Sequence, residues 1–144
     1  MSAYFAESVG YQLKRAQQEL RGAMDDALGE LGITTAQYAA LSALLPREAI
    51  SGAELARRCF VTPQTMNAIV VTLERSGWVE RRAHAEHGRV IETRILPAGA
   101  ELLRSAHRLV AAVEERMLRG LPASERTRMA AVLAGFAENL ADRA

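Results

Sequence analysis

Residues 62–82 read TPQTMNAIVVTLERSGWVERR, and this stretch predicts a short helix followed by a strand. Thr62 can cap the helix, and Pro63 would occupy its first position, where a missing N–H has no cost. Apolar residues then recur at helical spacing and predict a buried stripe of Met66, Ile69, Val70 and Leu73. Gly77 ends the helix, and residues 78–82 are typical of a strand.

A second short helix precedes this one, and a second strand follows. Ser51-Gly52-Ala53-Glu54 has the form of a capping box and starts a helix that runs to about Cys59. Residues 84–88 read as a polar loop and residues 90–96 as a returning strand. Two short helices followed by a two-stranded β-hairpin make a winged helix-turn-helix.

Longer amphipathic helices are predicted on both sides of this core. Apolar positions recur at steps of three and four from about Ser8 to Leu31, and Gly32 ends that helix. The segment Thr34–Gln37 is a capping box that starts another helix, which Pro46 breaks. Pro97 opens a long helix, and a last helix follows Gly120.

The composition agrees with a mainly α fold in one domain. The chain has 144 residues, with 49% hydrophobic and only 5% aromatic residues, which is enough for one compact core and favours helices over a β-sandwich. We assign residues 33–96 to the winged-helix core. Residues 1–32 and 97–144 are expected to form a helical dimerisation region.

The sequence also indicates a cellular compartment. Its single cysteine excludes an intrachain disulfide framework, and residues 1–15 lack the apolar core of a signal peptide. No window of about eighteen apolar residues is present. A cytoplasmic protein without a membrane segment is expected.

The front of the 62–75 helix has the chemistry of a DNA-reading surface. Its leading side chains are short and hydrogen-bonding, as entry into a major groove about 12 Å wide requires. Gln64 and Asn67 are of types that pair bidentately with adenine. Arginines on the hairpin could contact phosphates and the minor groove, and residues 51–96 carry seven arginines against five glutamates. The candidate DNA-binding residues are Ser51, Thr62, Pro63, Gln64, Thr65, Asn67, Arg75, Arg82, His87 and Arg89.

A lone polar helix face is more often only a solvated surface. The adjacent hairpin makes DNA binding the better interpretation here. A winged-helix module that binds protein rather than DNA remains the alternative from another functional class.

The segment SGAELARRCFVTPQTMNAIVVTLERSGWVERRAHAEHGRVIETRILPAGAELL resembles the core of the MarR-type (multiple antibiotic resistance regulator) transcription factors. The ordered set of matching features carries the resemblance: Leu55-Ala56, the polar residues from Thr62 to Asn67, Leu73-Glu74, Gly77 and Arg89. The likeness implies a repressor that acts as a homodimer, whose first and last two helices interlock and present two recognition helices to a palindromic operator. Half-sites would lie about 10 bp apart.

Two positions of the chain depart from this pattern in the DNA-reading region. His87 stands where an Asp commonly orients the arginine of the wing, so that ion pair is absent or pH-dependent. Ala68 stands where many members have an arginine, so base contacts are expected to differ. A third departure is Pro122, where the last helix often has a Ser or Thr cap.

The resemblance also implies an effector, because members often release DNA on binding small aromatic acids or phenolic compounds. Tyr11, Arg15 and Tyr38 are candidate lining residues, with an arginine for a carboxylate and rings for stacking. The alternative is that both tyrosines pack in an interface and Arg15 is solvated.

Other chemistries have weaker support. Cys59 could sense oxidants, which requires a low pKa and solvent access, but a buried helix-end cysteine is the simpler interpretation. His84 and His87 are spaced as metal ligands can be, yet zinc needs about four ligands and no further suppliers are evident. The sequence has no phosphate-binding glycine loop and no nucleophile elbow. We therefore expect no cofactor and no enzymatic activity.

Overall fold

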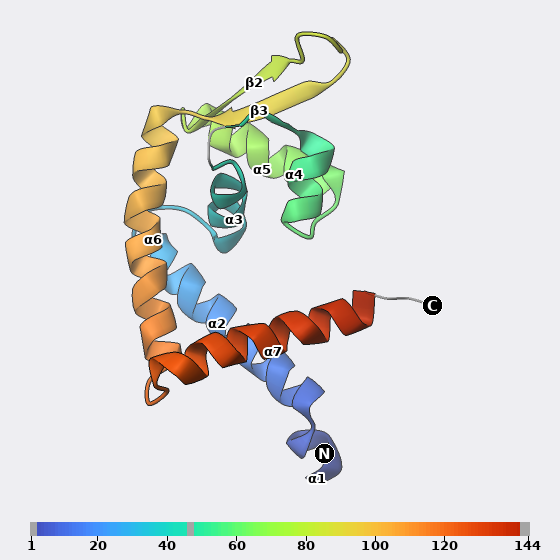
Figure 1. The fold of residues 1–144 in the computed structure, drawn as a ribbon. Helices are drawn as coiled ribbons and strands as arrows, with labels where there is room; N and C mark the ends of the chain where they lie inside the picture. Colours follow the sequence, from blue (N-terminus) through green and yellow to red (C-terminus); the bar gives the residue numbers. More distant parts are fainter. Residues whose placement is uncertain (1–2, 46–47, 142–144) are drawn as a thin grey trace. The chain divides into compact units, whose positions relative to one another are not determined.

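The computed structural model describes residues 3–45 and 48–141, and these residues divide into two compact units between Val113 and Glu114. The helices are α1 (Ala3–Glu7), α2 (Val9–Gly29), α3 (Thr35–Ala43), α4 (Gly52–Arg58), α5 (Pro63–Arg75), α6 (Pro97–Met117) and α7 (Ala123–Ala141) (Figure 1). The strands are β1 (Ile50–Ser51), β2 (Val79–Ala83) and β3 (Ile91–Ile95). The predicted mainly α winged helix-turn-helix is confirmed.

The sheet has one strand more than the sequence predicts. Its three strands are antiparallel in the order β1-β3-β2. The expected hairpin pairs Val79 with Ile95 and Ala83 with Ile91. The added strand is only two residues long and pairs Ile50 with Thr93. In Figure 1 the hairpin lies over α5 and α4.

The main core of the first unit lies between the sheet and helices α3 to α6. Met66, Val70 and Leu73 are buried as the predicted stripe requires, whereas Ile69 is only partly buried. They pack with buried residues from neighbouring elements: Ala40, Leu41, Leu44, Ile50, Leu55, Ala56, Val79, Ile95, Ala100 and Leu103. A second cluster of Leu28, Ile33 and Ala106 joins the end of α2 to α6. Burial of this apolar surface holds α5 beneath the hairpin.

Side-chain caps set where the helices begin. Thr34 and Gln37 form the predicted capping box at α3, in which each side chain accepts the other residue's backbone N–H. At α4, Oγ of Ser51 accepts from the amide of Glu54 at 3.2 Å. The predicted return bond from Glu54 is wrong, because its carboxylate binds the side chains of Arg57 and Arg58 instead. The helix predicted from about Ser8 is confirmed, with Ser8 as its N-cap, but the short α1 before it was not predicted.

Glycines end the helices and bring α6 close to the sheet. Gly32 and Gly77, which follow α2 and α5, have φ values of +72° and +77°, a conformation that glycine adopts at no steric cost. Gly99 serves a different purpose near the start of α6. A Cβ there would lie 2.2 Å from the carbonyl oxygen of Trp78, so the helix can approach this carbonyl only because residue 99 has no side chain.

The second unit contains the end of α6, a turn and α7. In the turn, Arg126 donates from Nε to the carbonyl of Leu121 at 3.0 Å and from Nη1 to Glu115 at 2.6 Å. α7 has no buried residue; Phe136 is partly buried, and the other large apolar side chains are exposed: Met129, Val132, Leu133 and Leu140. Within the described ranges, no helix combines the length and apolar character needed to cross a membrane.

Candidate nucleic-acid interface

The turn between α4 and α5 exposes the front of α5. Phe60 in this turn has φ +59°, a left-handed backbone conformation that is uncommon for a non-glycine residue. Its side chain is 95% exposed. Thr62 caps α5 by accepting the amide of Thr65 at 3.1 Å, and Pro63 follows as predicted. The residues of the first two turns that face solvent are Thr62, Pro63, Gln64, Thr65, Asn67 and Ala68. The helix therefore presents a narrow polar end, and the N-terminus of a helix favours anions such as phosphates.

An arginine of the wing holds one side chain of this surface. Arg81 on β2 donates from Nη1 to Oδ1 of Asn67 at 3.1 Å and from Nη2 to Oε1 of Glu74 at 3.0 Å. The hydrogen bond from Arg81 holds the pKa of Glu74 below its usual value. Sequence reasoning missed Arg81. One pattern in the sequence could have pointed to Arg81. Asn67 and Glu74 are seven residues apart and therefore share one face of the helix, and the strand that follows the helix carries an arginine.

A hollow lies beside this arginine, between α4, α5 and the sheet. Its polar groups come from Asn67, Arg81 and Thr93. The remaining lining residues are small or apolar: Gly52, Ala53, Pro63, Met66, Val70 and Ile91. The guanidinium of Arg81 thus lies between an apolar floor and the polar surface of α5.

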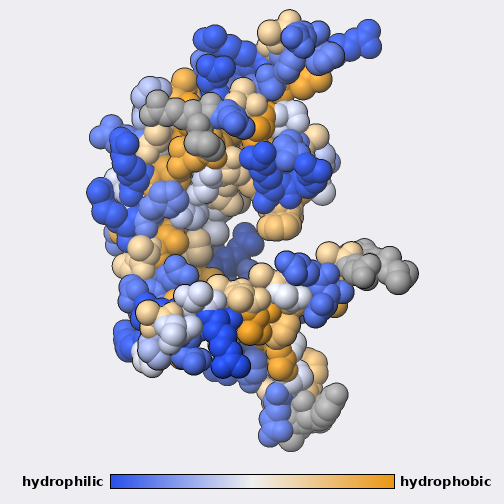
Figure 2. Space-filling model, viewed as in Figure 1, coloured by the Kyte–Doolittle hydropathy of each residue, from blue (hydrophilic) through white to orange (hydrophobic). Residues whose placement is uncertain are grey.

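The tip of the wing is folded around a histidine. Nδ1 of His84 accepts the amides of Glu86 at 3.0 Å and His87 at 3.1 Å, and the two histidine rings lie 5.1 Å apart. Arg89 is exposed, and none of the described residues forms an ion pair or hydrogen bond with it. In Figure 2 hydrophilic residues predominate at this tip, with some hydrophobic residues beside them. No group of three or more His, Cys, Asp or Glu residues in the described part of the chain is placed to hold a metal ion.

The other predicted contact residues differ in how free their side chains are. Arg75 is exposed on the last turn of α5. Arg82 is 72% exposed but pairs with Glu80 at 3.3 Å, and Glu80 also lies 3.7 Å from Arg94. The hydroxyl of Ser51 caps α4. Arg75 and Arg89 are therefore the cations of the predicted set whose charge has no acidic partner among the described residues.

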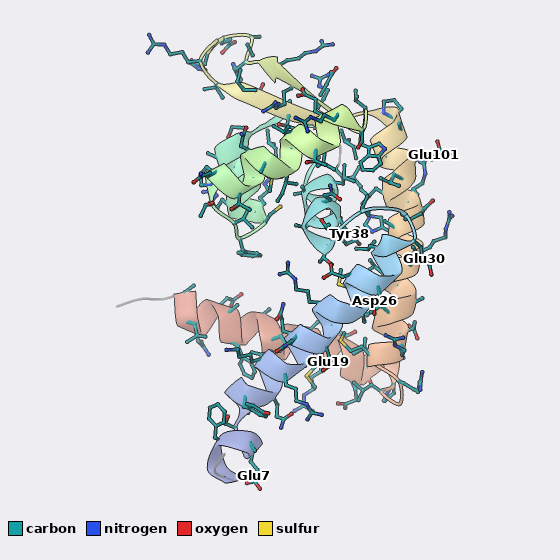
Figure 3. The ribbon with its side chains drawn as sticks, turned by 180° about the vertical axis from the view of Figure 1, so that it is seen from behind. Glu7, Glu19, Asp26, Glu30, Tyr38 and Glu101 are labelled. Atoms are coloured by element: carbon teal, nitrogen blue, oxygen red, sulfur yellow. The ribbon has the colours of Figure 1, made fainter. Side chains whose placement is uncertain are left out.

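The predicted effector residues are not gathered in one place within the chain. Oη of Tyr38 on α3 lies 2.7 Å from Nδ1 of His107 on α6, and Figure 3 shows Tyr38 between these helices. Tyr38 also packs on the cluster that contains Leu28, near the end of α2. Tyr11 lies near the other end of α2, seventeen residues or roughly 25 Å from Leu28 along the helix.

The local contacts of Tyr11 and Arg15 on α2 agree with their separation from Tyr38. The ring of Tyr11 packs on Phe5 at 5.0 Å, and Arg15 is exposed and donates to Gln12 at 3.5 Å. A pocket built from Tyr11, Arg15 and Tyr38 therefore does not exist within one described chain. The partner of Tyr38 was not predicted, because His107 is 69 residues away in the sequence.

The environment of Cys59 disfavours redox sensing. Its side chain packs on the main core, and burial raises the pKa of the thiol. Because the thiolate is the reactive form, a raised pKa lowers its fraction at neutral pH. Oxidant sensing through Cys59 has no support from the structure.

Comparison with known proteins gives consistent results. A model of the MarR family matches residues 31–90. The HTH-type transcriptional repressor Rv2887 of Mycobacterium tuberculosis is 36% identical over 117 residues, which are 81% of this chain and 84% of that protein. The crystal structure of Rv2887 in complex with salicylic acid has a TM-score of 0.72 and 33% identity, covering 90% of this chain and 96% of that chain. The transcriptional repressor CouR bound to a 23-mer DNA duplex has a TM-score of 0.87 and 25% identity, covering 94% and 96%.

Proposed function

The chain belongs to the MarR family, and from this premise we propose that it is a homodimeric, sequence-specific DNA-binding transcriptional repressor that a small aromatic acid or phenol releases from its operator. The observation that carries the proposal is the exposed polar front of α5 beside a wing whose tip presents the unpaired Arg89. This arrangement suits a helix that enters a major groove and a hairpin that contacts the adjacent minor groove. The proposal includes no catalytic step, in line with relatives that are regulators.

Two similar structures support the DNA and ligand parts of the proposal. CouR, which has the same fold over nearly the whole chain, is bound to a DNA duplex. Rv2887, which is similar in sequence and in fold, is bound to salicylic acid. An effector would act by shifting the spacing of the two recognition helices, since it can change affinity only by favouring one arrangement over the other.

The candidate DNA-binding residues form two groups that would make different kinds of contact with DNA. Gln64, Thr65 and Asn67 project from the front of α5 and would read base edges, and Thr62 and Pro63 would bring the helix N-terminus to a phosphate. Ser51, Arg75, Arg82 and His87 would contact the DNA backbone, and Arg89 would enter the minor groove. Base contacts determine sequence preference, whereas backbone contacts determine affinity.

Exposed apolar side chains support the homodimer. Leu133 is 41% exposed and Leu140 78% exposed on α7, while Phe5 and Val9 are 52% and 64% exposed near the N-terminus. Apolar surface of this kind needs a partner to remove it from water. A two-fold dimer would present two copies of α5 to half-sites about 10 bp apart.

The proposal predicts steep salt dependence and a specific role for Arg89. Affinity for DNA selected from a random pool should fall steeply with salt, because phosphate contacts release counterions. Arg89→Ala should weaken binding, mainly through loss of its minor-groove contact. Fluorescence anisotropy at several salt concentrations measures both quantities.

Arg104→Ala is the matched control, because it removes the same charge from an exposed position on α6 that is outside the proposed contact set. If the protein selects no DNA, or its affinity has no salt slope, the DNA-binding proposal is wrong and a protein-interaction module becomes the better hypothesis. A complex that persists with salicylate and a panel of aromatic acids and phenols would remove the ligand part alone.

A further inference from the structure

The contact between Arg81 and Asn67 restricts what the recognition helix can read. Asn67 lies on the exposed face of α5, but its Oδ1 already accepts from Nη1 of Arg81 at 3.1 Å. An arginine side chain has only donors, so the amide atom that faces Arg81 must be the oxygen and not the nitrogen. The orientation of the amide thus follows from chemistry.

The arginine is itself fixed in place. Its second terminal nitrogen donates to Oε1 of Glu74 at 3.0 Å, and 30% of the Arg81 side chain and 40% of the Glu74 side chain is exposed. The planar guanidinium therefore bridges Asn67 and Glu74, which are two turns apart on α5, and forms an ion pair with the carboxylate of Glu74. Arg81 directs Oδ1 of Asn67 toward β2, and the –NH₂ group is the part of the amide that remains for a ligand.

Adenine recognition by asparagine needs both amide atoms at one base edge. The oxygen accepts from adenine N6 while the nitrogen donates to N7. Guanine instead presents two neighbouring acceptors, O6 and N7, in the major groove. Oδ1 has two lone pairs and Arg81 occupies one of them, so the contact acts through direction. An asparagine whose oxygen is turned toward the protein presents mainly its –NH₂ group, which matches guanine.

We propose that Arg81 is a positioning residue that sets sequence specificity: by holding Oδ1 of Asn67, it makes α5 prefer guanine over adenine at the base that Asn67 contacts. This inference rests on the proposed DNA-binding function and specifies how one position of the operator is read. Without Arg81, the amide of Asn67 can turn so that Oδ1 and the –NH₂ group face one base edge, as bidentate pairing with adenine requires.

The first experiment compares base preference in wild-type protein and in Arg81→Met, which keeps a long apolar stem over the apolar floor of the hollow. Selection with Asn67→Ala first identifies the contacted base as the position whose preference disappears. At that base, wild-type protein should bind guanine more tightly than adenine. In Arg81→Met the affinity ratio of adenine to guanine should rise by about fivefold or more, the lower end of what one bidentate contact contributes.

Two further variants separate this effect from a general loss of binding. Glu74→Gln keeps an acceptor for Arg81 and leaves Asn67 engaged, so its base preference should equal that of wild-type protein. The double variant Arg81→Met with Asn67→Ala should show no shift toward adenine, because the shift requires the asparagine. A uniform loss of affinity in Arg81→Met, with the base preference unchanged, would overturn the inference while leaving the proposed DNA binding intact.

A second measurement uses only the wild-type protein and does not depend on how a variant folds. An operator that carries adenine at the contacted base is compared with one that carries purine, which lacks the N6 amino group. Affinity should be equal within about twofold, because Oδ1 is turned to Arg81 and does not meet that group. A loss of about fivefold or more with purine would show that Asn67 accepts from N6, and the inference would then be wrong.

Discussion

Gly99 shows how a single residue fixes the junction between the wing and α6. The position is buried, and a Cβ there would lie 2.2 Å from the carbonyl oxygen of Trp78 and 3.0 Å from Cγ1 of Ile95. The same carbonyl accepts the amide of Leu96 at 2.9 Å, so it cannot move away without breaking that hydrogen bond. The close approach therefore depends on the absence of a side chain.

Gly99→Ala should lower the free energy of unfolding by about 1–3 kcal/mol, because an added methyl group in a close-packed site forces the backbone apart. Urea denaturation followed by circular dichroism measures the change. Gly29→Ala is the control, since nothing lies within 4 Å of a Cβ there and its φ is ordinary. Equal stability of the two variants would contradict this account of the junction.

Single residues of the candidate interface also differ in how well the sequence predicts their environment. Exposure of Gln64, Thr65 and Asn67 follows from helical periodicity and could be predicted. The bond between Asn67 and Arg81 could not, because it depends on the angle at which β2 crosses α5. Local patterns indicate which way a side chain points, whereas packing decides which partner it meets.

At the scale of elements, a carboxylate joins α2 to α3. Oδ1 of Asp25 accepts from Oγ1 of Thr35 at 2.5 Å and from its backbone N–H at 3.2 Å. The hydroxyl bond is the largest cause that holds the pKa of Asp25 below its usual value, and the amide bond comes next. Hydrogen bonds to the charged form of a carboxyl lower its pKa in this way.

This contact should make stability depend on pH in a definite direction. A carboxyl whose pKa is lowered by folding stabilises the protein above its unfolded-state pKa, and that contribution is lost as the pH falls through the folded-state pKa. Wild-type protein should therefore lose more unfolding free energy than Asp25→Asn between neutral pH and about pH 3. Denaturant titrations at each pH measure the difference.

Thr35→Val, which lacks the hydroxyl but keeps the amide, should show an intermediate pH dependence. Glu54 and Glu74, whose pKa values are also lowered by arginines, are present in every variant and contribute equally. The same pH dependence in all three proteins would show that the contact does not form in solution.

Elements differ in how well the sequence predicts them. The ends of α2 and α5 follow from caps and glycines, whose conformational requirements are local. β1 has only two residues, too few for an alternating pattern, and it exists because β3 offers a free edge. The link between Tyr38 and His107 joins residues 69 positions apart, which no local pattern reports.

At the scale of the whole molecule, the exposed apolar stripe of α7 is the main feature that requires a second chain to cover it. The stripe consists of Met129, Val132, Leu133 and Leu140, none of which is buried in the described chain. An amphipathic last helix was predicted, but the sequence could not show that a single chain leaves most of its apolar face uncovered. That finding requires the burial of each side chain.

Leu133→Glu should convert the proposed dimer to a monomer, because a buried carboxylate without a partner opposes association. Sedimentation equilibrium measures the mass, and anisotropy should show a parallel loss of operator affinity. Ala131→Glu adds the same charge on the opposite side of α7, where the residue is also exposed, and should remain dimeric. A dimeric Leu133→Glu protein would exclude α7 as the interface.

The short strand β1 has a consequence for regulation. Ser51 pairs with Glu92 of β3 and also caps α4, so one residue belongs to both the sheet and the helix pair. The hairpin is thereby joined to α4 near the tip end of its strands and, through Arg81, to Asn67 and Glu74 of α5. Because these contacts join the hairpin to both helices, we expect an inducing molecule to separate or rotate two intact DNA-binding regions rather than to reshape either one.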